Sequence, residues 1–392
     1  MSDPKRNFSP RIGVLIPTRN RADLAIAAIR SVLDEPVDNI QLIVSDNSSV
    51  EDQKARLRGF CELFHSNVRY ISPPTPLSMS QHWDWAMQQS IRTADIDHFI
   101  YLTDRSIFKA GALSTIEKIV RTYPEEVISY DWTTVFDHSI PIVILEQQHT
   151  GQLLKLDATK LLALSAQAVF PRSLPRMMTC CVPVSVLEEI KQTFGTVFSS
   201  ISPDYNFCYR CLKTVNRIVF YDQAVFVSYA LARSTGMGIT RKATDASIDF
   251  EGQLDLNGRP QRFATPVPAF ETVTNYILHE YCVVKAETGS PEFPEISRRA
   301  YLARNARDIM SLEDKDLKRR MEEILKTQEG YSLAFNLKLL QLRVKLALRA
   351  RAKKALNLQW PSKSKPPLFD SLPEAMNYAQ RFRTNGDLPK TI

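Results

Sequence analysis

Short apolar runs alternate with amphipathic segments through the first part of the chain. The run Ile12–Pro17 is followed by Arg21–Leu33, whose apolar residues recur at helical spacing, and then by a second apolar run, Ile40–Val44. Continuous apolar runs of this length are typical of buried parallel strands, and strand, helix and strand in about 30 residues are typical of a βαβ unit. The pattern predicts an α/β fold with a mostly parallel, Rossmann-like sheet.

The same alternation predicts further elements up to about residue 230. Strands are expected at Val68–Ile71, Phe99–Leu102, Glu126–Tyr130, Arg217–Tyr221 and Ala224–Tyr229. Helices are expected at Glu51–Phe64, Ser80–Ile91, Ala112–Thr122, Leu153–Ala166, Ser185–Thr193 and Asp204–Leu212. The stretch Leu174–Pro183 has no clear period and is expected to be irregular.

Beyond about residue 265 the β signals fade and charged, helical periodicity takes over. Helices are expected at Phe270–Ala286, Glu295–Met310, Lys315–Thr327, Ser332–Leu356 and Leu372–Phe382. The chain is therefore expected to have an α/β domain over residues 1–240 and an α-helical C-terminal region over residues 241–392.

Polar residues end three of the apolar runs. They are Pro17-Thr18-Arg19-Asn20, Ser45-Asp46-Asn47-Ser48 and Thr103-Asp104-Arg105. In an open α/β sheet, ligands bind outside the carboxyl ends of the strands. The spacing therefore indicates a nucleotide-type ligand, with carboxylates where a diphosphate would need a cation.

Composition narrows the class of protein without identifying it. The 392 residues are 44% hydrophobic and 24% charged, which is ordinary for a globular protein. The sequence has no apolar run of about 18 residues and no N-terminal leader pattern, so a cytoplasmic protein is expected. The net charge of +7 favours an anionic partner. Cys208 and Cys211 form one CxxC without a second pair, so free thiols in a reducing compartment are expected rather than a zinc site.

The order VLIPTRNR, VSDNSS and FIYLTDRSIFKAGAL resembles the nucleotide-sugar-dependent glycosyltransferases of the GT-A type, in their large second family. The resemblance covers about residues 11–240. It implies that Pro17, Thr18, Arg19 and Asn20 contact the base and ribose of the donor nucleotide. It also implies that Asp46 accepts a hydrogen bond from the nucleoside, although a turn cap in the DNSS segment is an alternative for this carboxylate.

Asp104 matches the acidic position at which the family holds Mg²⁺ or Mn²⁺ against the donor diphosphate. This chain departs from the family pattern, because Arg105 stands where a second acid is common. Either Asp104 holds the metal alone, or Arg105 neutralises the diphosphate directly as a guanidinium can. An inert surface turn is the third possibility.

An inverting transfer also needs a carboxylate base for the acceptor hydroxyl. Asp204, after Ser202-Pro203, is the best match, with Asp222 and Asp131 as weaker alternatives, and an ordinary N-cap role explains Asp204 equally well. Arg233 begins a glycine-bearing segment that resembles the closing loop of the family, which suits a phosphate, with a plain connector as the alternative. Trp83 or Trp85 could stack on a sugar, and a core position is at least as plausible.

Residues 330–369 contain nine Lys or Arg and no acidic residue. A basic amphipathic helix is typical of a membrane-surface element, although it could equally pack on its own domain. Together with the resemblance, these features predict an inverting glycosyltransferase that uses a nucleotide-diphospho-sugar. The resemblance implies that it acts on a glycan or lipid-linked acceptor in surface polysaccharide or glycoconjugate synthesis. It would be cytoplasmic and peripheral on the inner membrane face. A non-catalytic, nucleotide-sugar-binding scaffold is the alternative, and no nucleic-acid partner is expected.

Overall fold

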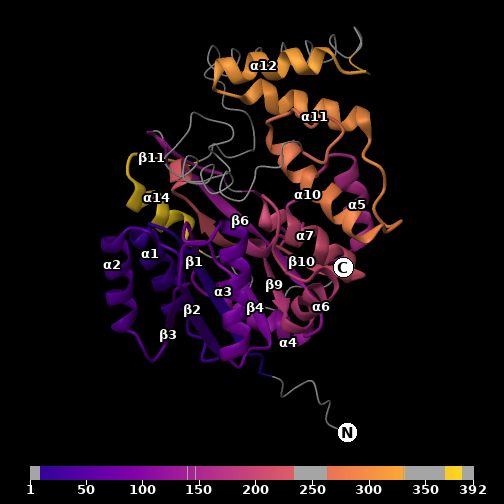
Figure 1. The fold of residues 1–392 in the computed structure, drawn as a ribbon. Coiled ribbons are helices and arrows are strands. Elements are labelled where there is room, and N and C mark those ends of the chain that lie inside the picture. Colours follow the sequence, from indigo (N-terminus) through magenta and orange to yellow (C-terminus); the bar gives the residue numbers. More distant parts are fainter. Residues whose placement is uncertain are drawn as a thin grey trace.

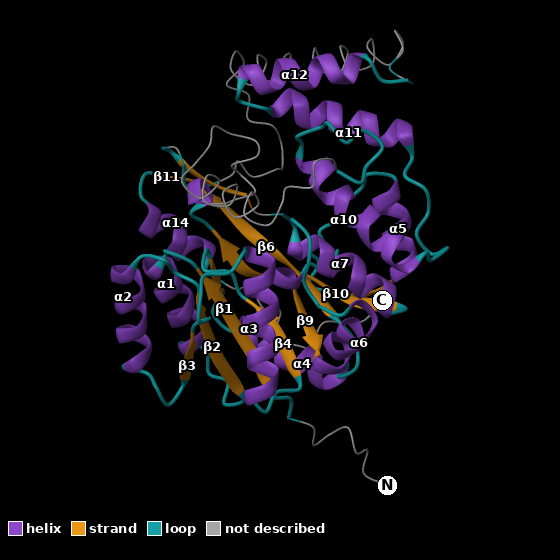
Figure 2. Ribbon diagram, in the orientation of Figure 1, coloured by secondary structure: helices purple, strands orange, loops and turns teal. Residues whose placement is uncertain are grey.

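The computed structural model describes residues 9–138, 140–145, 147–233, 263–329, 331 and 367–381. Within these ranges the strands form one eleven-stranded sheet, with helices packed on both of its faces (Figure 2). A group of helices from the C-terminal region stacks beyond one side of this layered body (Figure 1). The predicted α/β architecture with a helical C-terminal region is confirmed.

The first quarter of the chain alternates strands with helices. Its elements are β1 (Ile12–Thr18), α1 (Ala22–Leu33), β2 (Ile40–Asp46), α2 (Glu51–Glu62), β3 (Val68–Ile71), α3 (Met79–Thr93) and β4 (His98–Tyr101). The strands lie in the order β3-β2-β1-β4 and all run parallel. Their carboxyl ends therefore meet at one edge, as the sequence pattern predicts.

The sheet is mixed beyond β4. The elements that follow are β5 (Ser106–Phe108), α4 (Ala112–Thr122), β6 (Ile128–Phe136), β7 (Ile142–Leu145), β8 (Leu153–Asp157), α5 (Ala158–Ala166), η2 (Met177–Thr179), β9 (Cys180–Pro183), α6 (Val184–Phe194), α7 (Pro203–Thr214), β10 (Arg217–Ser228) and η3 (Leu231–Arg233). Strand β9 is antiparallel to both of its neighbours, β4 and β6. Strand β10 runs parallel to β6 and antiparallel to β5 and β8.

The C-terminal region contributes to the sheet as well as to the helical stack. Its described elements are α10 (Val273–Thr288), α11 (Arg298–Ser311), α12 (Lys315–Lys326), β11 (Leu368–Phe369) and α14 (Leu372–Ala379). Strand β11 pairs antiparallel with β7 at the edge of the sheet. Residues 368–379 therefore pack on the α/β body, whereas the sequence predicted only helices for residues 241–392.

Two apolar cores lie on opposite faces of the sheet, as the alternation along β1 shows. Val14 and Ile16 pack with α1 and α4, whereas Leu15 packs with α3 and the helices α5, α7 and α10. Successive side chains of a strand point to opposite faces, so a strand that is buried on both sides reads as a continuous apolar run. This burial explains why β1 could be predicted from sequence.

The strands expected at Arg217–Tyr221 and Ala224–Tyr229 form the single strand β10, and the short strands β5 and β7 were not predicted. Two further segments differ from the structure in the kind of element that they form. Leu153–Asp157 is strand β8, and the helix begins only at Ala158, because pairing with β10 decides the conformation of a segment whose apolar residues fit either period. Cys180–Pro183, expected to be irregular, is the short strand β9 at the centre of the sheet. The predicted helix over residues 332–356 lies outside the described residues.

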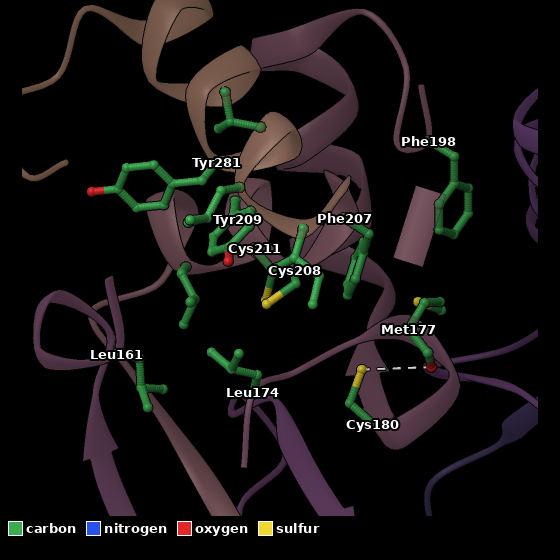
Figure 3. Close-up of a cluster of buried hydrophobic side chains, with 14 of the residues drawn as sticks. Leu161, Leu174, Met177, Cys180, Phe198, Phe207, Cys208, Tyr209, Cys211 and Tyr281 are labelled. Atoms are coloured by element: carbon green, nitrogen blue, oxygen red, sulfur yellow. Dashed lines mark hydrogen bonds between the residues drawn. The ribbon is translucent and has the colours of Figure 1, made fainter. Parts of the chain in front are cut away.

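The cysteines are free thiols, as the sequence predicts. Cys180, Cys208 and Cys211 lie in the apolar cluster between β9, α7 and α10, together with Leu174, Phe207 and Tyr281 (Figure 3). Burial raises the pKa of the Cys211 thiol to about 12. A thiol with such a raised pKa is a poor nucleophile and a poor metal ligand, so these cysteines act as small core residues.

Candidate functional site

The carboxyl ends of β1, β2 and β4 bring together the polar residues that the sequence singled out. Thr18 lies directly beside Asp46 in the parallel register of β1 and β2. Its hydroxyl donates a 2.9 Å hydrogen bond to Oδ2 of Asp104, which follows β4. We call Thr18, Asp46, Asp104 and their bonded neighbours the strand-end site.

Asn20 fastens the loop after β1 to the start of α2. Its backbone is in the left-handed region, with φ of +54°. Its side-chain oxygen accepts hydrogen bonds from the backbone N–H groups of Ser49 (2.9 Å) and Val50 (3.1 Å). Asn tolerates this conformation better than most residues, which accounts for the residue type here. The amide therefore shapes the loop, and its contact with a donor stays a prediction.

Asp46 is fully buried, and both of its carboxylate oxygens are engaged. Oδ1 accepts from the backbone N–H of Ser48 at 2.8 Å, which is the turn that the sequence allowed as an alternative. Oδ2 accepts from the hydroxyl of Tyr70 at 2.8 Å. Burial and the neighbouring Asp46 carboxylate raise the pKa of Tyr70. Asp46 thus anchors the edge of the site, and its bond to a nucleoside stays a prediction.

Asn47, part of the polar run after β2 but given no role of its own from the sequence, closes the same edge. Its side chain makes two hydrogen bonds with the backbone of Leu77, donating to the carbonyl at 2.8 Å and accepting from the N–H at 2.9 Å. Arg19 donates to the same carbonyl at 3.3 Å. The proline-containing loop before α3 is therefore held against the ends of β1 and β2. The turn residues around Asn47 were the only sequence signal for this contact.

Asp104 and two arginines form the charged part of the strand-end site. Asp104 is 4% exposed, and its Oδ1 lies 3.4 Å from Nη1 of Arg21. Arg105 donates from Nη1 to the carbonyl of Tyr229 at 3.2 Å. Burial lowers the pKa of Arg105, and the Asp104 carboxylate opposes that shift. Arg21 was missed from sequence because a charged residue just before a helix is usually a solvated end.

Asp104 could contribute only one carboxylate to a divalent cation at this turn, with phosphates and waters as the other ligands, and a metal at this position stays a prediction. Mg²⁺ and Mn²⁺ need oxygen ligands, and Asp104 is the acid at this turn. Its two oxygens already contact the hydroxyl of Thr18 and the guanidinium of Arg21. Among the described residues, no group of three or more His, Cys, Asp or Glu side chains is arranged to hold a metal.

Arg233 lies beside the same site, in η3 directly after β10. Its guanidinium pairs with Asp23 in the first turn of α1 at 2.7 Å. Asp137 holds this turn by accepting from the N–H groups of Ala230 (2.8 Å) and Leu231 (3.1 Å). Burial raises the pKa of the Tyr229 phenol to about 12, with Asp104, Asp23 and Asp137 acting in the same direction. Residues 234–238 of the predicted loop lie outside the described part of the chain.

Asp204 lies in the first turn of α7, after Pro203. The N-cap of this helix is Ser202, so the N-cap reading of Asp204 is wrong. Burial raises the pKa of Asp204, while the guanidinium of Arg176 and the N–H groups at the start of α7 oppose the rise. Arg176 also lies over the rings of Trp132 (4.5 Å) and Tyr205 (5.5 Å). A carboxylate with a raised pKa is a stronger base than an exposed one, which suits proton abstraction.

The two alternative bases are engaged elsewhere. Asp131 is 2% exposed, lies 2.9 Å from Nε2 of His149 and contacts Arg172. Asp222 accepts from the backbone N–H (3.0 Å) and hydroxyl (2.6 Å) of Thr150 and so holds a loop. Asp204 therefore remains the best candidate of the three.

The tryptophans of α3 differ in environment. Trp83 is 7% exposed and packs against Tyr101 (5.0 Å between centroids) and Phe198 (5.7 Å). This is the core position that the sequence allowed as the alternative to sugar stacking. Trp85 is half-buried at the edge of the same core.

The chain is similar to one protein family and to several solved structures. Residues 13–154 match the family model described as glycosyl transferase family 2. Among solved structures, the chain is similar to S. aureus TarS 1–349 in complex with UDP-GlcNAc, at 13% identity and a TM-score of 0.46, over 80% of this chain and 90% of that one. A longer S. aureus TarS structure matches at 13% identity and a TM-score of 0.45, over 82% and 56% of the two chains. The family match includes Thr18, Asp46 and Asp104 and ends before Asp204.

Proposed function

We propose that this chain is a glycosyltransferase that uses a nucleotide-diphospho-sugar as donor, and the match of residues 13–154 to glycosyl transferase family 2 supports the proposal. The observation that carries the proposal is the strand-end site, where Thr18, Asp46 and Asp104 meet at the carboxyl ends of parallel strands. This edge is where open α/β sheets bind nucleotides. The acceptor would be a glycan or a lipid-linked sugar of a surface polysaccharide or glycoconjugate.

Asp204 is proposed as the base of an inverting transfer. The acceptor hydroxyl would give its proton to the Asp204 carboxylate while its oxygen forms a bond to the anomeric carbon. The bond between that carbon and the diphosphate oxygen would break, and the nucleoside diphosphate would leave with the bonding electrons. Positive charge near the leaving diphosphate lowers the barrier of such a step.

Arg21 and Arg105 are proposed to supply that positive charge in place of a metal ion. Arg21 pairs with Asp104, and Arg105 interacts with the carboxylates of both Asp104 and Asp137. A guanidinium can contact two phosphate oxygens at once, which a single carboxylate-bound ion would otherwise do.

A binding screen tests the donor class. Nucleoside diphosphates of uridine, guanosine, cytidine and thymidine, and their sugars, would be added to the full chain while thermal stability is measured. We expect one nucleotide series to raise the unfolding midpoint, because a ligand that binds only the folded state stabilises it. The same donor should then release its nucleoside diphosphate on incubation. The absence of binding by every series would contradict the proposal, and binding without turnover would favour the scaffold.

Substitution of Asp204 tests the chemistry. Asp204→Asn should keep donor binding and lower turnover by about 10²-fold or more, the scale of lost general-base catalysis. Asp222→Asn is the matched control, because it removes an acid that holds a loop. Equal turnover in Asp204→Asn and the wild type would move the base to another residue.

Membrane association is proposed for the basic segment 330–369, most of which lies outside the described residues. Its nine Lys or Arg without an acid support attraction to anionic lipid. None of the described helices has the length and apolar character to cross a bilayer. We expect the full chain to sediment with vesicles that contain phosphatidylglycerol and not with neutral ones. Equal sedimentation with both would contradict an electrostatic association.

A further inference from the structure

The turn that leads into α7 is held by a residue from the C-terminal region. Ser200 adopts a left-handed backbone with φ of +63°, which is uncommon for a residue with a side chain. Ser202 is the N-cap of α7, yet its own side chain makes no capping hydrogen bond. The start of the helix that carries Asp204 is therefore ordered by other contacts.

Glu280 of α10 supplies these contacts on both sides of Asp204. Its Oε1 accepts from the backbone N–H of Ser202 at 2.7 Å. Its Oε2 accepts from the side-chain amide of Asn206 at 3.1 Å. Asn206 in turn accepts from the hydroxyl of Ser199 at 3.1 Å. One carboxylate therefore ties together the residues two positions before and two positions after Asp204.

The burial of this contact indicates a specific role. Glu280 and Asn206 are both fully buried. A buried carboxyl group, neutral or charged, costs more than an apolar side chain of the same volume, so helix docking alone would not need one. Burial raises the pKa of Glu280 to about 8, the Asp204 carboxylate acts in the same direction, and the donors from Ser202, Ser200 and Asn206 oppose the rise. The donors from Ser202 and Asn206 therefore hold the Glu280 carboxyl group in one orientation.

We propose that Glu280 is a positioning residue for Asp204, so that the C-terminal helices form part of the catalytic unit of the enzyme. This inference rests on the proposed function, in which Asp204 is the base. The hydrogen bonds of Glu280 fix the backbone before Asp204 and the first helical turn after it. They thereby set the direction in which the Asp204 carboxylate points. The family match ends at residue 154, so it includes neither Asp204 nor Glu280.

Other contacts hold α10 against α7 and allow the role to be tested in a folded protein. Arg210 of α7 pairs with both oxygens of Glu287 on α10, at 3.0 and 3.1 Å. Tyr209 and Tyr281 pack edge to face, 5.2 Å between centroids. Glu287→Gln is therefore a matched control, because it weakens a bond between the same two helices at a distance from Asp204 along α7.

The experiment compares Glu280→Gln, Glu280→Ala and Glu287→Gln in the full chain. The readout is release of nucleoside diphosphate from the donor found in the binding screen, with kcat and donor KM measured separately. We expect both Glu280 variants to lower kcat by about 10-fold or more with KM changed less than about twofold, since small misplacements of a catalytic group cost rate rather than binding. Glu287→Gln should lower the unfolding midpoint and leave kcat unchanged.

A double-mutant cycle separates positioning from general destabilisation. In the Asp204→Asn background, Glu280→Gln should lower kcat no further, because its effect acts through the missing base. Equal fold losses in both backgrounds, or a kcat unchanged by Glu280→Gln, would overturn the inference. If Asp204→Asn alone left kcat unchanged, or if no donor bound the wild type, the proposed function itself would fail, and the two failures can be told apart.

Discussion

At the scale of single residues, the site is built from polar side chains that the protein itself has already engaged. Asp104 contacts Thr18 and Arg21, and Arg105 contacts the carbonyl of Tyr229. Such groups are fixed in place before a ligand arrives. Preorganised charges of this kind act more strongly on a developing anion than mobile ones.

If Arg21 and Arg105 neutralise the negative charge of the donor diphosphate, transfer should not depend on a divalent ion. EDTA should leave nucleoside diphosphate release unchanged. Arg105→Met should weaken donor binding by about 10-fold, the loss of one charge-assisted contact, with Arg105→Lys in between. Arg121→Met, at an exposed arginine of α4 paired with Glu117, is the control. Loss of turnover with EDTA and its return with Mn²⁺ would contradict this assignment.

His82 gives a prediction for stability against pH. It is 3% exposed, bonded to the hydroxyl of Ser45 at 2.8 Å, and burial lowers its pKa to about 3. In the unfolded chain the His82 side chain takes up a proton near pH 6.5, whereas in the folded protein it stays neutral down to about pH 3. The contribution of neutral His82 to stability is therefore complete above pH 6.5 and is lost as the pH falls towards 3.

Urea unfolding at pH 7 and pH 5 would measure this effect. Between pH 7 and pH 5, the free energy of unfolding of the wild type should fall by up to about 2 kcal/mol more than that of His82→Gln. This figure corresponds to 1.36 kcal/mol for each pH unit below the pKa of the unfolded histidine, about 6.5. His65→Gln, at an exposed histidine, should behave as the wild type does. Equal losses in wild type and His82→Gln would show that His82 does not titrate in this way.

At the scale of elements, side chains from distant segments complete several helix ends. Helix α4 begins after Gly111, whose φ is +82° and which has no side chain to cap the helix. Glu35, which lies after α1, accepts from the N–H groups of Gly111 (2.6 Å) and Leu113 (3.0 Å) instead. A carboxylate at a helix N-terminus satisfies free donors and interacts favourably with the helix dipole.

Removal of this cap should be measurable as a loss of stability. Glu35→Ala is expected to lower the free energy of unfolding by about 1–2 kcal/mol, the usual cost of losing a helix cap. Glu117→Ala on the same helix removes only an i,i+4 pair with Arg121 and should cost about 0.5 kcal/mol or less. Denaturant unfolding of the two variants gives the comparison, and equal costs would contradict a capping role for Glu35.

At the scale of the whole molecule, one apolar core joins the sheet to the C-terminal helices. It contains Leu15 of β1, Tyr101 of β4, Phe207 of α7, Tyr281 of α10 and Met321 of α12. The predicted boundary at residue 240 therefore separates regions that share a core. Domains that share one core are expected to unfold together.

We expect a single unfolding transition for the full chain, followed by circular dichroism and by tryptophan fluorescence. Leu15→Ala and Tyr281→Ala, which both open fully buried positions, should each lower the midpoint of that same transition at a cost of about 3 kcal/mol. Two separate transitions, each sensitive to only one substitution, would show that the C-terminal helices unfold independently.

The sequence alone determined the parallel half of the sheet and the position of the strand-end site. Strands such as β1 are buried on both faces, so their apolar runs are continuous, and the polar residues that follow them mark the ligand edge. The same local signals gave α7 with Asp204 in its first turn. These features could be read because each depends on residues adjacent in the chain.

Only the tertiary structure decided the rest. Strand β9, the start of β8 and the return of β11 to the sheet depend on pairing partners far away in the sequence. The contacts of Arg21 with Asp104 and of Glu280 with the start of α7 join residues more than 70 positions apart. No local pattern records such contacts, because hydrogen bonds and burial between distant segments exist only once the chain has folded.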